Sequence, residues 1–210
     1  MRAWHFTNGD KLRDGRPLPK NGELLKHNGP VNICESGLHA SKRIIDALGY
    51  SPGSIICRVE CGDIVETRGD KLVCRERTIL WRVDGENLLK RFTRKCARDV
   101  AHLWDMPDIV RQYLYTGDED IRSVASSAAS SAASCAASCA ASRAASCAAY
   151  WAASCLAYSA ASRAASRAAY YAAYSAASSA ASSAAYCVAS YKQNRRLTAL
   201  VIAEHKRESK

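Results

Sequence analysis

The chain has 210 residues, enough for one or two domains, and its 30 Lys and Arg outnumber its 20 Asp and Glu to give a formal net charge of +10. No segment has the form of a signal peptide or of an uncharged membrane span, which argues against secreted and membrane-spanning classes and predicts a cytoplasmic protein. The ten cysteines lack the spacing of a disulfide framework, so we expect reduced thiols rather than disulfides or metal ligands.

Residues 1–84 are typical of a small α+β head domain. Ala3–Thr7 predicts a strand, and Val31–Cys34 predicts a second one after a loop rich in Gly and Pro. Ser41 stands at the expected N-cap of a short helix that runs through Leu48.

The second half of this domain is rich in residues that favour strands. Ser54–Cys61, Asp63–Thr67 and Lys71–Val83 are the candidate strands, and Arg68-Gly69 marks a turn between the last two. These segments predict a meander, although the pattern leaves the strand order open.

Residues 85–117 are expected to form a helical neck. Apolar residues recur at three- and four-residue steps between Leu88 and Leu103, which predicts an amphipathic helix. Asp105, followed two residues later by Pro107, predicts the start of a second helix.

From Val124 to Tyr191 a four-residue unit, Ala-Ala-Ser-x, is repeated seventeen times. The second position is always alanine, the third is Ser or Tyr, and the fourth varies among Ser, Cys, Arg, Trp and Tyr. Alanine is the best helix former and neither Gly nor Pro interrupts the segment, so we expect helix here rather than a β-solenoid. Residues 118–191 are assigned to this helical region and residues 192–210 to a basic C-terminal helix or tail.

The four-residue period has a geometric consequence. Four residues turn an ideal α-helix by about 400°, so the alanine stripe drifts by roughly 40° per unit. The helix must then supercoil with a partner, break into shorter antiparallel segments or be packed on several sides. Because one methyl contributes only about 0.8 kcal/mol, the repeat needs many neighbours. The Tyr and Trp residues between Tyr150 and Tyr174 are expected to be a packing site, with an exposed ligand surface as the alternative.

Residues that could carry chemistry are sparse. The five histidines lack zinc-site spacing, and the sequence has neither a phosphate-binding glycine loop nor a nucleophile elbow, so no metal site is predicted. The repeat has three Arg and no acid, and residues 192–210 are also basic, which could attract nucleic acid. Since the arginines are widely spaced and no basic–aromatic module is present, solvated charge is the favoured interpretation.

One local motif stands out. Cys34-Glu35-Ser36-Gly37-Leu38-His39-Ala40, followed by Gly69-Asp70-Lys71-Leu72-Val73, resembles an uncharacterised domain of phage and prophage proteins that often end in alanine-rich repeats. The stretches at Arg91-Phe92 and Trp104-Asp105 are similar to helices that precede alanine-rich arrays in immunity-like proteins. The resemblance implies a phage or prophage setting and no established activity. This chain differs from the usual pattern by placing Ser where charged residues commonly follow the alanines.

A second resemblance concerns Gly37-Leu38-His39-Ala40-Ser41, which is similar to the Gly-Ile/Leu-Tyr-x-Ser element of ADP-ribosyltransferase folds. This resemblance implies NAD as cofactor, with His39 stacking on nicotinamide, His5 holding the ribose and Glu76 as the catalytic acid. His39 stands where that family has Tyr. Histidines that serve only to stabilise the fold are the alternative.

The sequence therefore favours a non-enzymatic phage or prophage accessory protein without a cofactor. In this hypothesis an α+β head and a helical neck carry an alanine-rich module that assembles with protein partners or with itself. The alternative is an ADP-ribosyltransferase-like enzyme with a helical scaffold tail. A nucleic-acid-associated rod is a third, less supported hypothesis.

Overall fold

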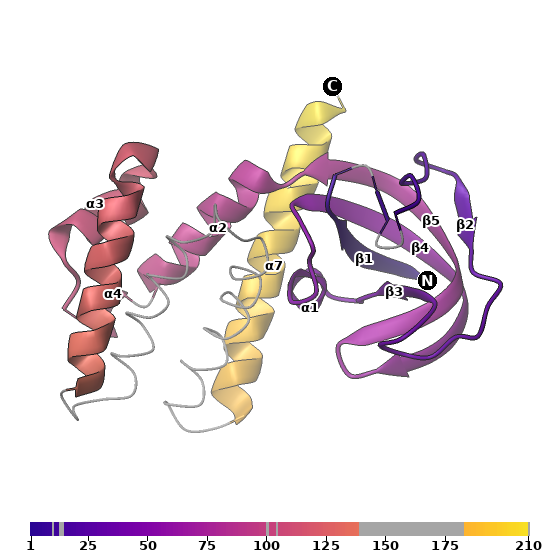
Figure 1. The fold of residues 1–210 in the computed structure, drawn as a ribbon, viewed down its shortest axis with the longest axis horizontal. Coiled ribbons are helices and arrows are strands. Elements are labelled where there is room, and N and C mark those ends of the chain that lie inside the picture. Colours follow the sequence, from indigo (N-terminus) through magenta and orange to yellow (C-terminus); the bar gives the residue numbers. More distant parts are fainter. Residues whose placement is uncertain (10, 13–14, 100, 104, 139–182, 210) are drawn as a thin grey trace. The chain divides into compact units, whose positions relative to one another are not determined.

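The computed structural model describes residues 1–9, 11–12, 15–99, 101–103, 105–138 and 183–209 (Figure 1). The chain divides into two compact units. The first unit contains Met1–Glu86 and Asn194–Lys210, and the second unit contains Asn87–Gln193. The C-terminal residues, which the sequence predicts as a separate segment, thus belong to the same unit as the N-terminal domain.

The first unit is built on an antiparallel sheet of five strands (Figure 1). β4 (Ile55–Arg68) and β5 (Lys71–Asp84) form a long hairpin; β1 (Arg2–Thr7) pairs with β4, and both β2 (Leu24–Lys26) and β3 (Leu38–Ala40) pair with β5. Trp4 and Ser41 exchange two backbone hydrogen bonds of 2.8 and 3.0 Å. This bridge joins the end of β3 to β1, so the sheet closes into a small barrel.

Small and aliphatic side chains fill the barrel interior. Because successive residues of a strand alternate between two faces, the core residues of β3 and β4 fall at every second position. The buried members are Ala3, Leu38, Ala40, Cys57, Val59, Cys61, Leu72, Cys74 and Ile79. The mixed α+β class predicted from the sequence is confirmed.

Two local predictions for the first unit are wrong. Val31–Cys34 forms a turn rather than a strand, because Cys34 has a φ of 76° and Asn32 bridges to Ser36. Ser41 does not cap the helix, since its backbone is engaged with β1. α1 (Ile44–Leu48) begins after Arg43, which makes no side-chain cap.

The C-terminal part of α7 (Ser183–Glu208) is anchored on the first unit. The side-chain Oδ1 of Asn194 accepts a hydrogen bond of 3.3 Å from the backbone N–H of Ile45 in α1. Further along the helix, the ring of His205 stacks on Trp81 of β5, with centroids 4.2 Å apart and planes 7° from parallel. Trp81 in turn meets Trp4 edge-on at 5.7 Å, so an aromatic column connects β1, β5 and α7.

The second unit consists of helices. α2 (Glu86–Asp99) ends before the 3-10 helix η1 (Ala101–Leu103), so the helix predicted through Leu103 is shorter than expected. α3 (Asp108–Thr116) starts after Pro107 instead of at Asp105. A second 3-10 helix, η2 (Glu119–Ile121), leads directly into α4 (Arg122–Ser138). None of the helices among the described residues combines the length and the apolar character needed to cross a membrane.

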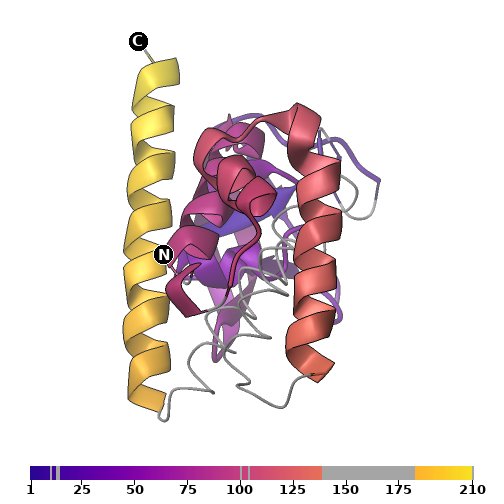
Figure 2. The same cartoon turned by 90° about the vertical axis from the view of Figure 1, so that its left-hand side faces the viewer.

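The start of the repeat is packed through its alanines. α4 is a straight, unbroken helix (Figure 2). Ala125 and Ala129, both at the second position of the unit, are completely buried, whereas Ser127 and Ser131 at the fourth position are exposed. The alanines pack with Met106 and with three residues of α3, namely Val110, Tyr113 and Leu114.

Both ends of the repeat that the structure describes are helical, residues 124–138 in α4 and residues 183–191 in α7. The intervening residues 139–182 lie outside the described part of the chain, and so does the aromatic cluster between Tyr150 and Tyr174. A continuous helix over residues 124–191 therefore remains a prediction.

Candidate functional site

The candidate polar residues of β1 face the barrel interior. His5 lies directly opposite Cys57 of β4, and Ala3 lies opposite Val59. Ala3, Cys57 and Val59 all belong to the interior core. Since directly opposed residues share a face and alternate residues of a strand point the same way, His5 and Thr7 are also directed inward.

His5 is a partly exposed histidine that is held in its neutral form. Burial lowers the pKa of its ring well below the ordinary value of 6.5, and the positive charge of Arg77 lowers it further. A hydrogen bond that the ring donates to the His39 backbone opposes this shift only in part. The other ring nitrogen of neutral His5 is therefore an acceptor.

The ring of His39 stabilises the turn that precedes β3. Its Nε2 accepts a hydrogen bond of 3.0 Å from the backbone N–H of Cys34, and its Nδ1 lies 3.2 Å from the carbonyl oxygen of Gly37. These two contacts fit the neutral tautomer with the proton on Nδ1. Cys34 and Gly37 have φ values of 76° and 100°, so the ring braces a turn with two left-handed residues. His39 contacts His5 through its backbone.

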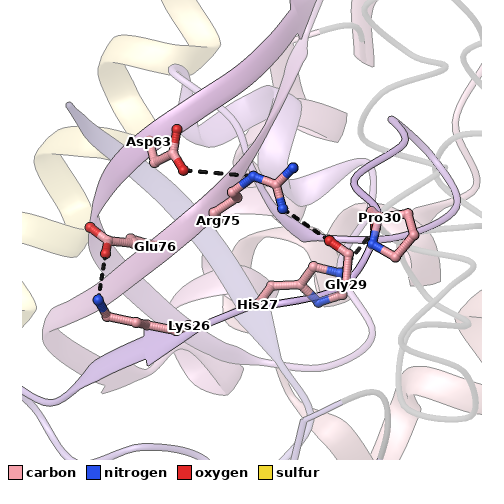
Figure 3. Close-up of polar contacts among 7 residues, drawn as sticks. All are labelled: Lys26, His27, Gly29, Pro30, Asp63, Arg75 and Glu76. Atoms are coloured by element: carbon pink, nitrogen blue, oxygen red, sulfur yellow. Dashed lines mark hydrogen bonds and ion pairs between the residues drawn. The ribbon is translucent and has the colours of Figure 1, made fainter.

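Glu76 forms an ion pair on the surface of the sheet (Figure 3). Its Oε1 lies 2.9 Å from Nζ of Lys26, which is directly opposite on β2. Its neighbour Arg75 reaches Asp63 of β4 at 3.7 Å and donates a 3.0 Å hydrogen bond to the Gly29 carbonyl oxygen. The structure thus places the three residues that the ADP-ribosyltransferase resemblance implies in three settings: His5 on β1 in the barrel, His39 on β3 with its ring against the preceding turn, and Glu76 in a surface ion pair.

Arg77 is the residue that sequence reasoning missed. Its side chain is only 5% exposed, and Nη1 donates a 2.7 Å hydrogen bond to the His39 carbonyl oxygen. Burial lowers the pKa of its guanidinium. Arg77 stands two positions before the core residue Ile79, so its place in the strand alternation was the available signal. Three consecutive charges, Arg75-Glu76-Arg77, are instead typical of a solvent-exposed segment, so the sequence did not mark Arg77 as buried.

Three thiols surround this guanidinium. Burial raises the pKa of Cys57. Cys74 donates its S–H to the Leu38 carbonyl oxygen at 3.2 Å, and its contact with the neighbouring Cys61 thiol raises the pKa of Cys74. All three cysteines are free and buried, as the composition predicts.

The Thr7 hydroxyl is an unsatisfied polar group in the same interior. Thr7 is 3% exposed, and its Oγ1 has no hydrogen-bond partner of standard geometry among the described residues, although it lies beside the Cys57 thiol. Buried hydroxyls are usually hydrogen-bonded, because an unmade bond costs about 1–3 kcal/mol. The barrel interior therefore contains a buried cation from β5 together with a neutral histidine and a buried hydroxyl from β1, and β4 lies between these two strands.

A separate polar cluster lies on the surface at the start of β5. Lys71 hydrogen-bonds the exposed Cys34 thiol, which raises the pKa of Lys71. The Lys71 ammonium is 4.8 Å from the ring centroid of Tyr50, whose hydroxyl donates a 2.7 Å bond to Asp70. Partial burial, together with this bond to the Asp70 carboxylate, raises the pKa of Tyr50 to about 12.

The comparisons with known proteins define a domain but no activity. Residues 4–91 match the model of a family described as a domain of unknown function, DUF7666. This match runs from β1 into α2 and includes His5, His39, Glu76 and Arg77. No curated protein and no solved structure gives a significant match to the chain. Within the described residues, no group of three or more His, Cys, Asp or Glu is positioned to hold a metal ion.

The neutral state of His5 predicts a loss of stability in acid. Because the folded-state pKa is lowered, the unfolded state binds one more proton between that value and about 6.5. Stability is fully present above the unfolded-state pKa and falls as pH decreases through this window, by at most about 1.4 kcal/mol per pH unit. Urea unfolding at pH 7.5 and 5.5 measures the effect, and His5→Gln should reduce the difference. If His5→Gln lost as much stability as wild type between pH 7.5 and 5.5, this role of His5 would be contradicted.

Proposed function

We propose that this chain is a phage or prophage accessory protein that acts by assembling with protein partners, including further copies of itself, through its alanine-rich helices. The observation that carries the proposal is the complete burial of Ala125 and Ala129 against α3. The same repeat position is alanine in all seventeen units, so the property that allows this contact recurs along the whole repeat. The resemblance of the Cys34–Ala40 motif to phage and prophage proteins supports the setting and, with it, the host cytoplasm.

Alanine suits close association of helices for a physical reason. Its methyl group lets two backbones approach closely without the side-chain entropy that a larger residue loses. Each methyl contributes only about 0.8 kcal/mol, so stability requires a long row of such contacts. Where the structure describes the repeat, one helix supplies that row within the chain. We propose that other units use the same position toward a protein partner.

Site-specific photo-crosslinking tests the assembly. A benzoylphenylalanine at the fourth repeat position, at Ser131 or Ser179, is expected to form covalent adducts with a second polypeptide in cells that express the full chain. The same probe at Glu60, an exposed residue of β4, is the control and should form none. Adducts confined to the chain itself at both repeat positions would contradict assembly with another protein.

An ADP-ribosyltransferase-like enzyme is the second candidate. The observation in its favour is the contact between β1 and β3, which places His5 against the His39 backbone. Under this candidate NAD is held by His5 and His39, and Glu76 acts as the acid. Against it, the His39 ring is used in its own turn and Glu76 is paired with Lys26.

Release of nicotinamide from NAD, followed by mass spectrometry, separates the two candidates. The assembly proposal expects no release above the buffer control. Release that is abolished by His5→Ala and by Glu76→Gln would favour the enzyme. Glu66→Gln is the matched control, because Glu66 is also a β4–β5 hairpin carboxylate in a surface ion pair, with Arg68.

A further inference from the structure

One face of α2 carries a row of positive charges. This basic row consists of Arg91, Arg94, Lys95 and Arg98. Because the four residues follow one another at three- and four-residue spacings, they lie within an arc of about 100° around the helix axis. The two acidic residues of the helix, Glu86 and Asp99, fall outside that arc. The row is therefore a surface of one sign, about 10 Å long.

The opposite face of α2 is taken up by the core of the protein. Leu89 and Phe92 are 1% and 0% exposed, whereas Arg91 and Lys95 are exposed to solvent. A basic amphipathic helix that binds a membrane buries its apolar face among the lipids. Here the apolar face is already buried in protein, so α2 offers a partner its cations and not an inserting surface.

Two cations of the row are held against tyrosine rings of α3. Cζ of Arg94 lies 5.9 Å from the ring centroid of Tyr113, and Arg94 also hydrogen-bonds the hydroxyl of that residue. Cζ of Arg98 lies 5.1 Å from the ring centroid of Tyr115. Tyr115 is 62% exposed, so an aromatic ring stands in solvent beside the cations. The sequence does not show this arrangement, because the rings and the cations belong to different helices.

We propose that the basic row of α2, together with Tyr115 of α3, is a binding surface for single-stranded nucleic acid. Over the roughly 10 Å of the row, one strand presents about three phosphates, and guanidinium groups bind phosphate through paired hydrogen bonds. An exposed aromatic ring beside such cations suits the stacking of an unpaired base. In a duplex the bases are already stacked on one another, so the ring favours a single strand. The net charge of +10 adds long-range attraction.

This surface is separate from the alanine-rich repeat, so its test does not depend on the proposed assembly. Fluorescence anisotropy of the full chain with a labelled thymidine oligonucleotide of about 20 nucleotides measures the binding. Arg91→Gln/Lys95→Gln should weaken it about tenfold or more and lower the slope of log affinity against log salt by about 1.4, since each lost phosphate contact removes about 0.7.

The matched control for this double variant is Lys20→Gln/Lys42→Gln. It removes the same net charge, but from exposed positions of the first unit. Its affinity for the oligonucleotide should stay within about twofold of wild type, because distant charges act only through the screened field of the protein. If the two double variants weakened binding equally, the basic row would not be the site.

Substitution of Tyr115 tests the choice of a single strand. Tyr115→Leu should weaken binding about fivefold or more without changing the salt slope, since stacking releases no counter-ions, and Tyr115→Phe should restore the affinity. Wild-type protein should bind the same oligonucleotide less tightly when it is paired with its complement. Tighter binding of that duplex, or of polyglutamate as a mimic of an acidic protein, would overturn the choice of partner.

A measurement on the wild-type chain does not depend on the folding of any variant. Irradiation with an oligonucleotide that contains 5-bromouracil should crosslink the base to the tryptic peptide that includes Tyr115, which mass spectrometry identifies. Crosslinks found only in residues 1–86 or 192–210 would place the nucleic acid elsewhere and overturn this surface.

Discussion

Replacing Gly37 with alanine is expected to destabilise the first unit by roughly 3 kcal/mol or more. Gly37 has a φ of 100°, a region that residues with a Cβ rarely occupy. An added Cβ would also lie 2.7 Å from Cγ2 of Val73 and 2.9 Å from Cγ1 of Val31. Both costs act on the turn that His39 braces. Urea unfolding of the full chain, followed by tryptophan fluorescence, measures the change.

Gly22→Ala is the control for this substitution. Gly22 has a similar φ of 86°, but no atom lies within 4 Å of the position that a Cβ would occupy. Its replacement should therefore cost only the backbone strain, about 1–2 kcal/mol. If Gly37→Ala and Gly22→Ala lowered the free energy of unfolding equally, crowding of a Cβ against Val31 and Val73 would be absent.

The second large effect is expected at the C-terminal helix. Leu197 is completely buried in the part of α7 that belongs to the first unit, so Leu197→Ala should cost about 2–5 kcal/mol. Ile202 lies on the same helix and is 38% exposed, and Ile202→Ala should stay within about 0.5 kcal/mol of wild type. Thermal unfolding followed by tryptophan fluorescence compares them. Similar stabilities would mean that α7 does not pack on the sheet.

The sequence predicted the elements of the barrel better than their connections. Residues that favour strands indicated β1 and the segments that form β4 and β5. The pattern could not show that Ser54–Cys61 and Asp63–Thr67 belong to one strand, because Asp63, where the second segment starts, has a left-handed φ of 42°. The sequence analysis missed β3, because this strand has only three residues and follows directly after the turn at Cys34.

Long-range pairings explain why the site was harder to predict than the fold. The bond between Arg77 and the His39 carbonyl oxygen joins residues 38 positions apart, and local composition carries no signal for it. The Lys26–Glu76 ion pair depends in the same way on the β2–β5 register. His39 was found as part of a motif, yet its contacts with Cys34 and Gly37 give it a role in the turn.

The repeat illustrates the opposite case, in which the period itself predicted the packing. Four-residue spacing places Ala125 and Ala129 one above the other on α4, and both are buried against α3. The fourth-position residues Ser127 and Ser131 are exposed, as expected for the variable position. The period does not reveal which surface receives the alanines, because many helices can accept a row of methyl groups.

Hydrogen–deuterium exchange of the full chain tests most directly whether the alanines form a packing surface. We expect backbone amides of residues 124–132 to exchange slowly in wild type. Ala129→Leu should accelerate them roughly tenfold or more, because overpacking the buried position costs about 1–3 kcal/mol. Ser131→Leu, one half-turn further at an exposed position, should leave the rates nearly unchanged. Rapid exchange in wild type, or equal effects of the two substitutions, would contradict a packed alanine row and leave the repeat as a solvated helix.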